Sequence, residues 1–175
     1  MAGFNYLRTF IIITVTAFAN LSMAQNLTLD QLIAMKSQSV AHIDEALTLK
    51  NWQMTEAEES TDTTLSHATY AYGKSSYDDK ALSFLSVYFR PYDTNRILLQ
   101  VNSRSAYNNY MARIKALGFR LQASRIEDGS VVKLYRTLYT RIKISTSTST
   151  DEMDATRTSY SFIIIGQGDN LFDEE

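Results

Sequence analysis

The sequence contains no cysteine, one proline and two histidines among its 175 residues. The absence of cysteine excludes disulfide bonds, thiolate zinc sites, thiol nucleophiles and a lipid anchor on cysteine, since each needs a sulfur atom. A formal net charge of -2 gives no overall attraction for phosphate, so we expect no nucleic-acid partner and no attraction to an anionic membrane surface. The 45% hydrophobic and 21% charged residues are typical of one globular domain or two small ones.

Residues 1–24 have the pattern of a signal peptide. Arg8 supplies a positive charge, residues 10–21 form a short apolar run, and Ser22 and Ala24 place small residues at the two positions that a signal peptidase inspects. A membrane-spanning helix needs about 18 to 20 apolar residues, so this run is too short to remain as an anchor. We expect cleavage after Ala24 and no stable membrane insertion of the processed chain. Export without cysteine is typical of a bacterial periplasmic or extracellular protein.

Helix signals follow the cleavage site. Thr28, with Gln31 three residues later, predicts a capping box, so a helix should begin at Leu29. Asn51 tolerates the left-handed conformation and predicts the end of this one helix. Lys36 fills the single gap in a stripe with the spacing of one buried helix face, whose apolar members are Leu29, Ile33, Val40, Ile43 and Leu47.

From Trp52 the hydrophobic period changes from helical to two. Four segments rich in aromatic and aliphatic residues are separated by polar turn sequences, which indicates four antiparallel strands. These strand candidates are residues 52–58, 65–72, 81–89 and 97–101.

The same pattern then begins again. Residues 107–117 predict a second amphipathic helix that ends at Gly118, and Phe119 follows this glycine as Trp52 follows Asn51. Four more strand candidates come after it, at residues 119–126, 131–138, 139–145 and 158–165. Asp128 and Gly129 are the strongest hairpin-turn signal in the chain.

The chain is therefore predicted to be an α+β protein with two helix-plus-four-strand repeats, residues 27–101 and 102–166, in one antiparallel sheet. Because each repeat has one helix to cover its strands, both helices should pack on one face and leave the other face open. Residues 167–175 form an acidic tail, which should be frayed from Asp169 to Glu175. A chance succession of hairpins is the alternative to a true repeat.

Some residues carry a resemblance to known proteins. The stretch from Ser75 to Lys80, the helix end from Ala116 to Phe119 and the mature start at Gln25 resemble a group of small uncharacterised exported proteins of Bacteroidota. The layout of two helix-plus-four-strand repeats is similar to that of the β-lactamase inhibitor protein family. That likeness rests on layout and no shared motif, and this chain lacks the cysteines that brace each repeat in the family. It implies a protein partner, of which an inhibited enzyme is one form.

A few polar residues are candidates for chemistry. His42 and His67 lack a nucleophile or orienting carboxylate at a recognisable spacing, so we interpret both as packed or rim residues. Asp151, Glu152 and Asp154 could bind calcium, but they lack the glycine and distal glutamate of a calcium loop. The sequence leaves open whether these three carboxylates bind a metal. We expect no cofactor and no catalytic residue.

Charge is unevenly distributed along the chain. Between residues 104 and 143 there are nine basic and two acidic residues, whereas residues 25–100 contain six basic and ten acidic ones. If Leu121, Leu134, Ile142 and Ile144 face the helices, alternation places their neighbours on the open face. The predicted contact surface for an acidic partner consists of Arg120, Lys133, Tyr135, Arg141 and Lys143.

The sequence thus predicts an exported, non-catalytic binding protein that uses the open sheet face, with a protein partner or an inhibited enzyme bound there. A cell-envelope hydrolase is the alternative in the enzyme class. A glycan-binding module is a third interpretation, in which exposed Tyr70 and Tyr72 would stack on sugar rings. An enzyme should show a pocket with converging polar groups, and a binding protein a broad, shallow face.

We predict that the exported protein begins at Gln25, because Ser22 and Ala24 satisfy the small-residue rule after a short apolar run. N-terminal mass analysis of the purified protein measures this. An intact Met1 on a membrane-embedded product would contradict it.

Overall fold

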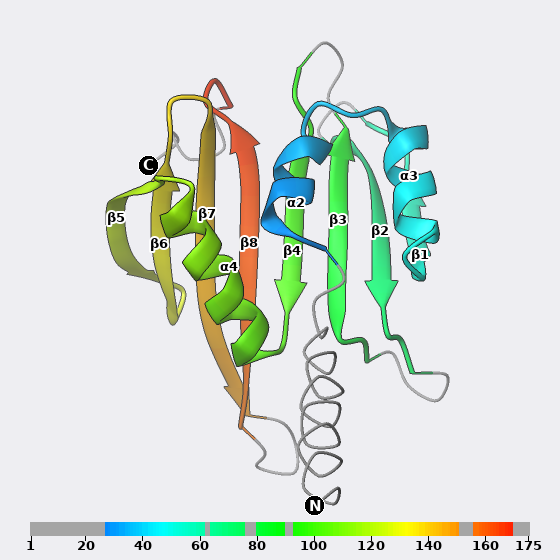
Figure 1. Ribbon diagram of the computed structural model, residues 1–175. Helices are drawn as coiled ribbons and strands as arrows, with labels where there is room; N and C mark the ends of the chain where they lie inside the picture. The colour runs from blue at the N-terminus through cyan, green and yellow to red at the C-terminus, as the bar shows by residue number, and fades with distance from the viewer. Residues whose placement is uncertain (1–26, 62–63, 76–79, 90–92, 151–155, 170–175) are drawn as a thin grey trace, which may run out of the picture.

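The computed structural model describes residues 27–61, 64–75, 80–89, 93–150 and 156–169. Its strands form one eight-stranded antiparallel sheet with the order β1-β2-β3-β4-β8-β7-β6-β5 (Figure 1). Two four-strand meanders therefore meet where β4 pairs with β8. The strands are β1 (Trp52–Glu58), β2 (Ser66–Tyr72), β3 (Ser83–Phe89), β4 (Arg96–Val101), β5 (Arg120–Glu127), β6 (Ser130–Arg136), β7 (Thr140–Thr150) and β8 (Thr156–Gly166).

The described helices lie on one face of this sheet: α2 (Leu29–Met35), α3 (Val40–Thr48) and α4 (Arg104–Ala116). Figure 1 shows α2 and α3 over the first meander and α4 over the second, so none of the described helices covers the opposite face. The predicted α+β class and one-sided packing are confirmed. Within the described residues, no helix has the length and hydropathy that crossing a bilayer requires.

The first helix begins and the segment ends as predicted, but one continuous helix from Leu29 to Asn51 is wrong. The capping box of Thr28 and Gln31 is present, and Asn51 has the left-handed φ of 62°. Between them the chain breaks after Met35 and starts α3 at Val40. The predicted apolar stripe is confirmed in part. Leu29, Ile43 and Leu47 are buried in one core and Ile33 packs against it, but Val40, the first residue of α3, is 45% exposed.

Polar groups on both sides of the break stabilise it. The Ser39 hydroxyl is the N-cap of α3 and accepts from the backbone N–H of His42 at 3.4 Å. The side-chain amide of Asn95 donates to the carbonyl oxygens of Met35 at 3.0 Å and Gln38 at 2.9 Å. The Met35 carbonyl also accepts from the backbone N–H of Gln38 at 3.3 Å, so Asn95 adds side-chain hydrogen bonds to the carbonyls at the end of α2. A residue some sixty positions away in sequence thus satisfies the break.

Where each helix is followed by its first strand, the two repeats match at an offset of 67 residues. Asn51 and Gly118 both have a positive φ, 62° and 76°. Each is followed by a buried aromatic residue, Trp52 after Asn51 and Phe119 after Gly118. Each following strand carries a β-bulge at the equivalent place, between Met54 and Glu56 in β1 and between Leu121 and Ala123 in β5. The predicted hairpin turn is also confirmed, since Asp128 and Gly129 have φ values of 47° and 74°.

One core joins the two repeats. The Tyr110 ring of α4 lies 5.0 Å from the Phe162 ring of β8, and its hydroxyl donates to the Leu27 carbonyl at 2.8 Å. On the surface, the Arg113 guanidinium makes a two-pronged ion pair with Asp30, at 2.8 and 2.7 Å, which links α4 to α2. This pair lowers the pKa of Asp30, first through the hydrogen bond from Arg113. The buried cluster contains side chains from all described helices and strands except β5, which contributes through the adjacent Phe119.

We predict that Trp52→Ala and Phe119→Ala each lower the free energy of unfolding by about 3 to 5 kcal/mol, because each leaves a cavity at the junction between a helix and the first strand that follows it. Trp52 is 4% exposed and Phe119 is 8% exposed. Leu121→Ala is the control, since Leu121 is 51% exposed on β5. Denaturant melts measure all three. A Phe119→Ala variant as stable as Leu121→Ala would remove one of the two anchors.

Candidate functional site

The face of the sheet opposite the helices is the candidate site. Cross-strand partners share a face, so the register separates this open face from the core-facing side chains. From β1 to β5 across the sheet, the open face carries Gln53, Glu56 and Glu58; His67, Thr69 and Ala71; Phe84, Ser86 and Tyr88; Arg96, Leu98 and Gln100; Ser161, Ile163 and Ile165; Arg141, Lys143 and Ser145; Val132, Leu134 and Arg136; and Arg120, Arg125 and Glu127.

The centre of the open face is apolar and slightly hollow. Leu98 of β4 and Ile163 of β8 are cross-strand partners at the junction of the two meanders. With Tyr88, Arg96 and Ile97 they line a hollow of about 250 Å³. Because Leu98 and Ile163 are only partly buried, a partner that covered them would gain hydrophobic contact.

Three of the five predicted contact residues lie on the open face, as expected. Arg141 and Lys143 alternate with Ile142 and Ile144, which are buried against the helices. Arg120 is on the same face as Arg141, because both are linked through their common cross-strand neighbour on β6.

The predictions for Lys133 and Tyr135 are wrong. Tyr135 is the cross-strand partner of Ile142, is 8% exposed and belongs to the core, and Lys133 pairs with Ile144 on the same helix-facing side. Leu134, which was expected to face the helices, instead pairs with Lys143 on the open face. The error arose because β6 has apolar residues at both alternate positions, so alternation within the strand does not say which of them enters the core.

Arg136 is the open-face residue that the sequence interpretation missed. It lies one residue after Tyr135 and is exposed, so the burial of the tyrosine turns the arginine outward. If Tyr135 is taken as a core residue, the alternation of side chains along the strand places Arg136 on the open face.

One carboxylate neutralises part of the positive charge that β5 to β7 carry on the open face. Lys143 Nζ lies 2.8 Å from a Glu127 oxygen, and the Arg125 guanidinium pairs with the other oxygen of Glu127. These hydrogen bonds, that from Lys143 first, lower the pKa of Glu127, so the carboxylate stays ionised. Of the described side chains that β5 to β8 place on this face, Glu127 is the one carboxylate, and it lies at the far end of β5 from Arg120.

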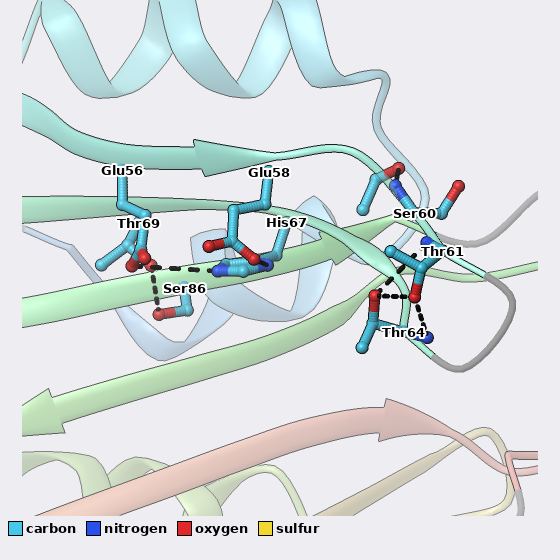
Figure 2. A network of polar contacts seen from close by, with 9 residues as sticks. Glu56, Glu58, Ser60, Thr61, Thr64, His67, Thr69 and Ser86 are labelled. Carbon is cyan, nitrogen blue, oxygen red and sulfur yellow. Dashed lines mark hydrogen bonds and ion pairs between the residues drawn. The ribbon is translucent and has the colours of Figure 1, made fainter.

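The opposite half carries an acidic cluster around a histidine. Figure 2 shows Glu56 and Glu58 of β1 reaching toward His67 of β2, with carboxylate–imidazole distances of 3.8 and 4.0 Å. The His67 ring stacks on Tyr88 of β3 at 5.3 Å. His67 is thus packed at the rim of the open face, while His42 is exposed on α3.

Within the described residues, no hydroxyl group hydrogen-bonds to the His67 ring. Two hydroxyls on the same face, those of Ser86 and Thr69, hydrogen-bond to each other at 2.9 Å (Figure 2). A catalytic histidine needs a hydrogen bond to the group that it deprotonates. Throughout the described ranges, no three histidine or carboxylate side chains are placed to hold a metal ion. The sequence left open whether Asp151, Glu152 and Asp154 bind a metal, and these three residues lie outside those that the structure describes.

Tyr70 and Tyr72 do not lie on the open face. Tyr70 is 1% exposed, and its hydroxyl donates to Asp44 at 3.1 Å; burial, and then this bond, raise its pKa. Tyr72 packs on the Trp52 ring at 5.4 Å on the helix-facing side. Their expected role as exposed stacking platforms for sugar is therefore wrong.

The start of the acidic tail is ordered rather than frayed. Arg96 of β4 makes a two-pronged ion pair with Asp169, with both nitrogen–oxygen distances 2.8 Å. The Asp169 side chain is 2% exposed. A buried, charge-assisted pair of this kind fixes the segment after β8 beside the apolar hollow. Residues 170–175 lie outside the described chain.

A buried lysine, Lys36, links the break between α2 and α3 to the start of β7 in the second repeat. Lys36 is 7% exposed, and its ammonium donates to the Thr140 hydroxyl at 2.7 Å and to the Tyr139 carbonyl at 3.5 Å. Burial lowers the pKa of Lys36. Its nitrogen is directed to the start of β7, so we assign it a bracing role between α2 and that strand.

No protein-family model matches the chain, and neither a curated protein nor a solved structure matches it.

We predict that Lys36 makes a contribution to stability that rises with pH below the ordinary lysine pKa of 10.5, so that stability rises more with pH in wild type than in Lys36→Met. Since the folded-state pKa of Lys36 is lowered, the unfolded chain binds more protons in this range, and deprotonation favours folding. Urea melts from about pH 8 to 10.5 measure the slope. Lys115→Met, at an exposed position of α4, is the matched control and should keep the rise. Identical slopes for wild type and Lys36→Met would contradict the prediction.

Proposed function

We propose that this chain is a non-catalytic binding protein whose open sheet face binds an acidic surface of a protein partner. The observation that carries the proposal is the combination, on one uncovered face, of an apolar centre at Leu98 and Ile163 with the basic side chains of β5 to β7. An inhibited enzyme is one form that such a partner can take. The proposal includes export, so that the partner lies in the periplasm or outside the cell.

The composition of the face supports this function. Interfaces bind through a central apolar or aromatic patch, and arginine is enriched among the residues that contribute most to affinity. Here the apolar hollow is bordered by Arg96 and lies next to the strands that carry Arg141 and Lys143. Charge complementarity with an acidic partner would raise the association rate, while contact with the hollow would slow dissociation.

The hydrolase alternative gains no comparable observation. His67 is held by Glu56, Glu58 and Tyr88, and the Ser86 hydroxyl is engaged by Thr69. The central hollow is lined mostly by apolar side chains rather than by converging polar groups.

We predict that Leu98→Asp and Arg141→Glu each weaken partner binding about tenfold or more, because one disrupts the apolar centre and the other reverses a charge on the open face. The chain as exported is immobilised, a retained protein is identified by mass spectrometry from an envelope extract, and its affinity is then measured in purified form over a salt series. Denaturant melts verify that each variant folds.

Matched controls carry the same changes on the helix side. Leu49→Asp replaces an exposed leucine next to α3, and Arg104→Glu reverses an exposed charge at the start of α4. Both should bind as wild type does. Equal loss in open-face and helix-side variants, or no loss in folded open-face variants, would refute the proposed binding surface.

A further inference from the structure

Three arginines lie directly opposite one another across β5, β6 and β7. Arg120 is the cross-strand partner of Arg136, and Arg136 is the cross-strand partner of Arg141. Partners of this kind have Cβ atoms about 4.5 to 5.5 Å apart, so three guanidinium groups share one end of the open face. Like charges in this position destabilise a sheet. The row therefore costs the fold stability that a bound anion would restore.

Two of the three arginines, Arg120 and Arg136, have no ion-pair partner among the described side chains. Arg120 and Arg136 are exposed, and neither side chain makes a hydrogen bond or ion pair with another described residue. The carboxylate on this side of the sheet, Glu127, is at the other end of β5 and is bound by Lys143 and Arg125. The positive potential at Arg120 and Arg136 is thus uncompensated among the described side chains.

These two arginines also line a hollow. It has a volume of about 490 Å³ and lies between the turn that follows α4 and the turn that follows β6. Two polar side chains, Gln122 and Thr137, contribute hydrogen-bonding groups. Its full lining is Leu117, Gly118, Arg120, Gln122, Arg136, Thr137 and Leu138.

We propose that Arg120 and Arg136 form a clamp for the carboxylate groups of an acidic peptide segment of the partner. This inference rests on the proposed function and names the part of the partner that docks at this end of the face. A guanidinium presents two parallel N–H donors that match the two oxygens of a carboxylate, and two such groups side by side fit adjacent aspartate or glutamate side chains. The Gln122 and Thr137 side chains supply partners for peptide groups, and Leu117 and Leu138 supply apolar contact.

The test titrates the chain as exported with N-acetylated, amidated tetraglutamate. Calorimetry gives the affinity, and the side-chain Nε–Hε signals of the arginines report which of them are contacted. Tetraglutamine is the uncharged control peptide. An oligogalacturonate of similar charge and inorganic phosphate are the other arms, because they offer a sugar carboxylate and a phosphate to the same clamp.

The Arg120→Gln and Arg136→Gln variants should each bind tetraglutamate about tenfold more weakly, because each loses charge-assisted hydrogen bonds. The matched control is Lys133→Gln, which removes one positive charge from the helix-facing side of the same strand as Arg136 and should bind within about twofold of wild type. Arg136→Gln should also raise the urea midpoint, because it relieves repulsion from both neighbours. A residue with a merely structural role would lower the midpoint instead.

Equal tetraglutamate affinity in wild type, Arg120→Gln and Arg136→Gln overturns the clamp, as does equal binding of tetraglutamine. Tighter binding of oligogalacturonate or phosphate than of tetraglutamate overturns the assignment to a peptide. The failure of the clamp is distinguishable from that of the binding face. Suppose that Leu98→Asp and Arg141→Glu no longer bind the purified partner while Arg120→Gln and Arg136→Gln still bind it. That result would support the proposed binding face and refute the clamp.

Discussion

The pairing of β4 with β8 is the constraint on which the rest of the structure depends. Five residue pairs in register, from Ile97 with Ile164 to Val101 with Tyr160, join two meanders into one sheet. Because this pairing buries Leu99, Phe162 and Ile164 beneath α2 and α4, the helices of both repeats have to pack on the same side. The same register places Leu98 beside Ile163 on the other side, so the apolar centre of the open face follows from the way the core is closed.

Local sequence signals predicted most of the fold. Strand alternation, the Thr28 capping box and the Asp128 hairpin turn each act within a few residues, and each was found where expected. The break before α3 was missed because its causes are distant in sequence: Asn95 satisfies the end of α2, and Lys36 reaches Thr140. Apolar residues at helical spacing do not show where a helix is interrupted, because both parts of an interrupted helix can pack against the same core.

The candidate site was predicted in part for a related reason. Alternation fixes a face when only one of two neighbouring positions is apolar, as around Arg141 and Lys143 in β7. In β6, both Leu134 and Tyr135 can enter a core, and the choice is made by the cross-strand partner, Ile142, rather than by the strand itself. The acidic cluster around His67 could not be found from spacing either, because β1, β2 and β3 bring its members together only in the sheet.

The arrangement of the two repeats has a consequence for the distribution of charge. Antiparallel pairing of their last strands relates the repeats by an approximate two-fold axis through the β4–β8 pair, so equivalent positions point the same way from opposite ends of the sheet. At these positions Gln53 corresponds to Arg120, and Glu58 to Arg125. The charges at equivalent positions of a nearly symmetric sheet therefore differ, and the resulting dipole lies in the plane of the sheet. An approaching acidic protein would feel a torque before contact, which turns it so that its negative side meets β5 to β7.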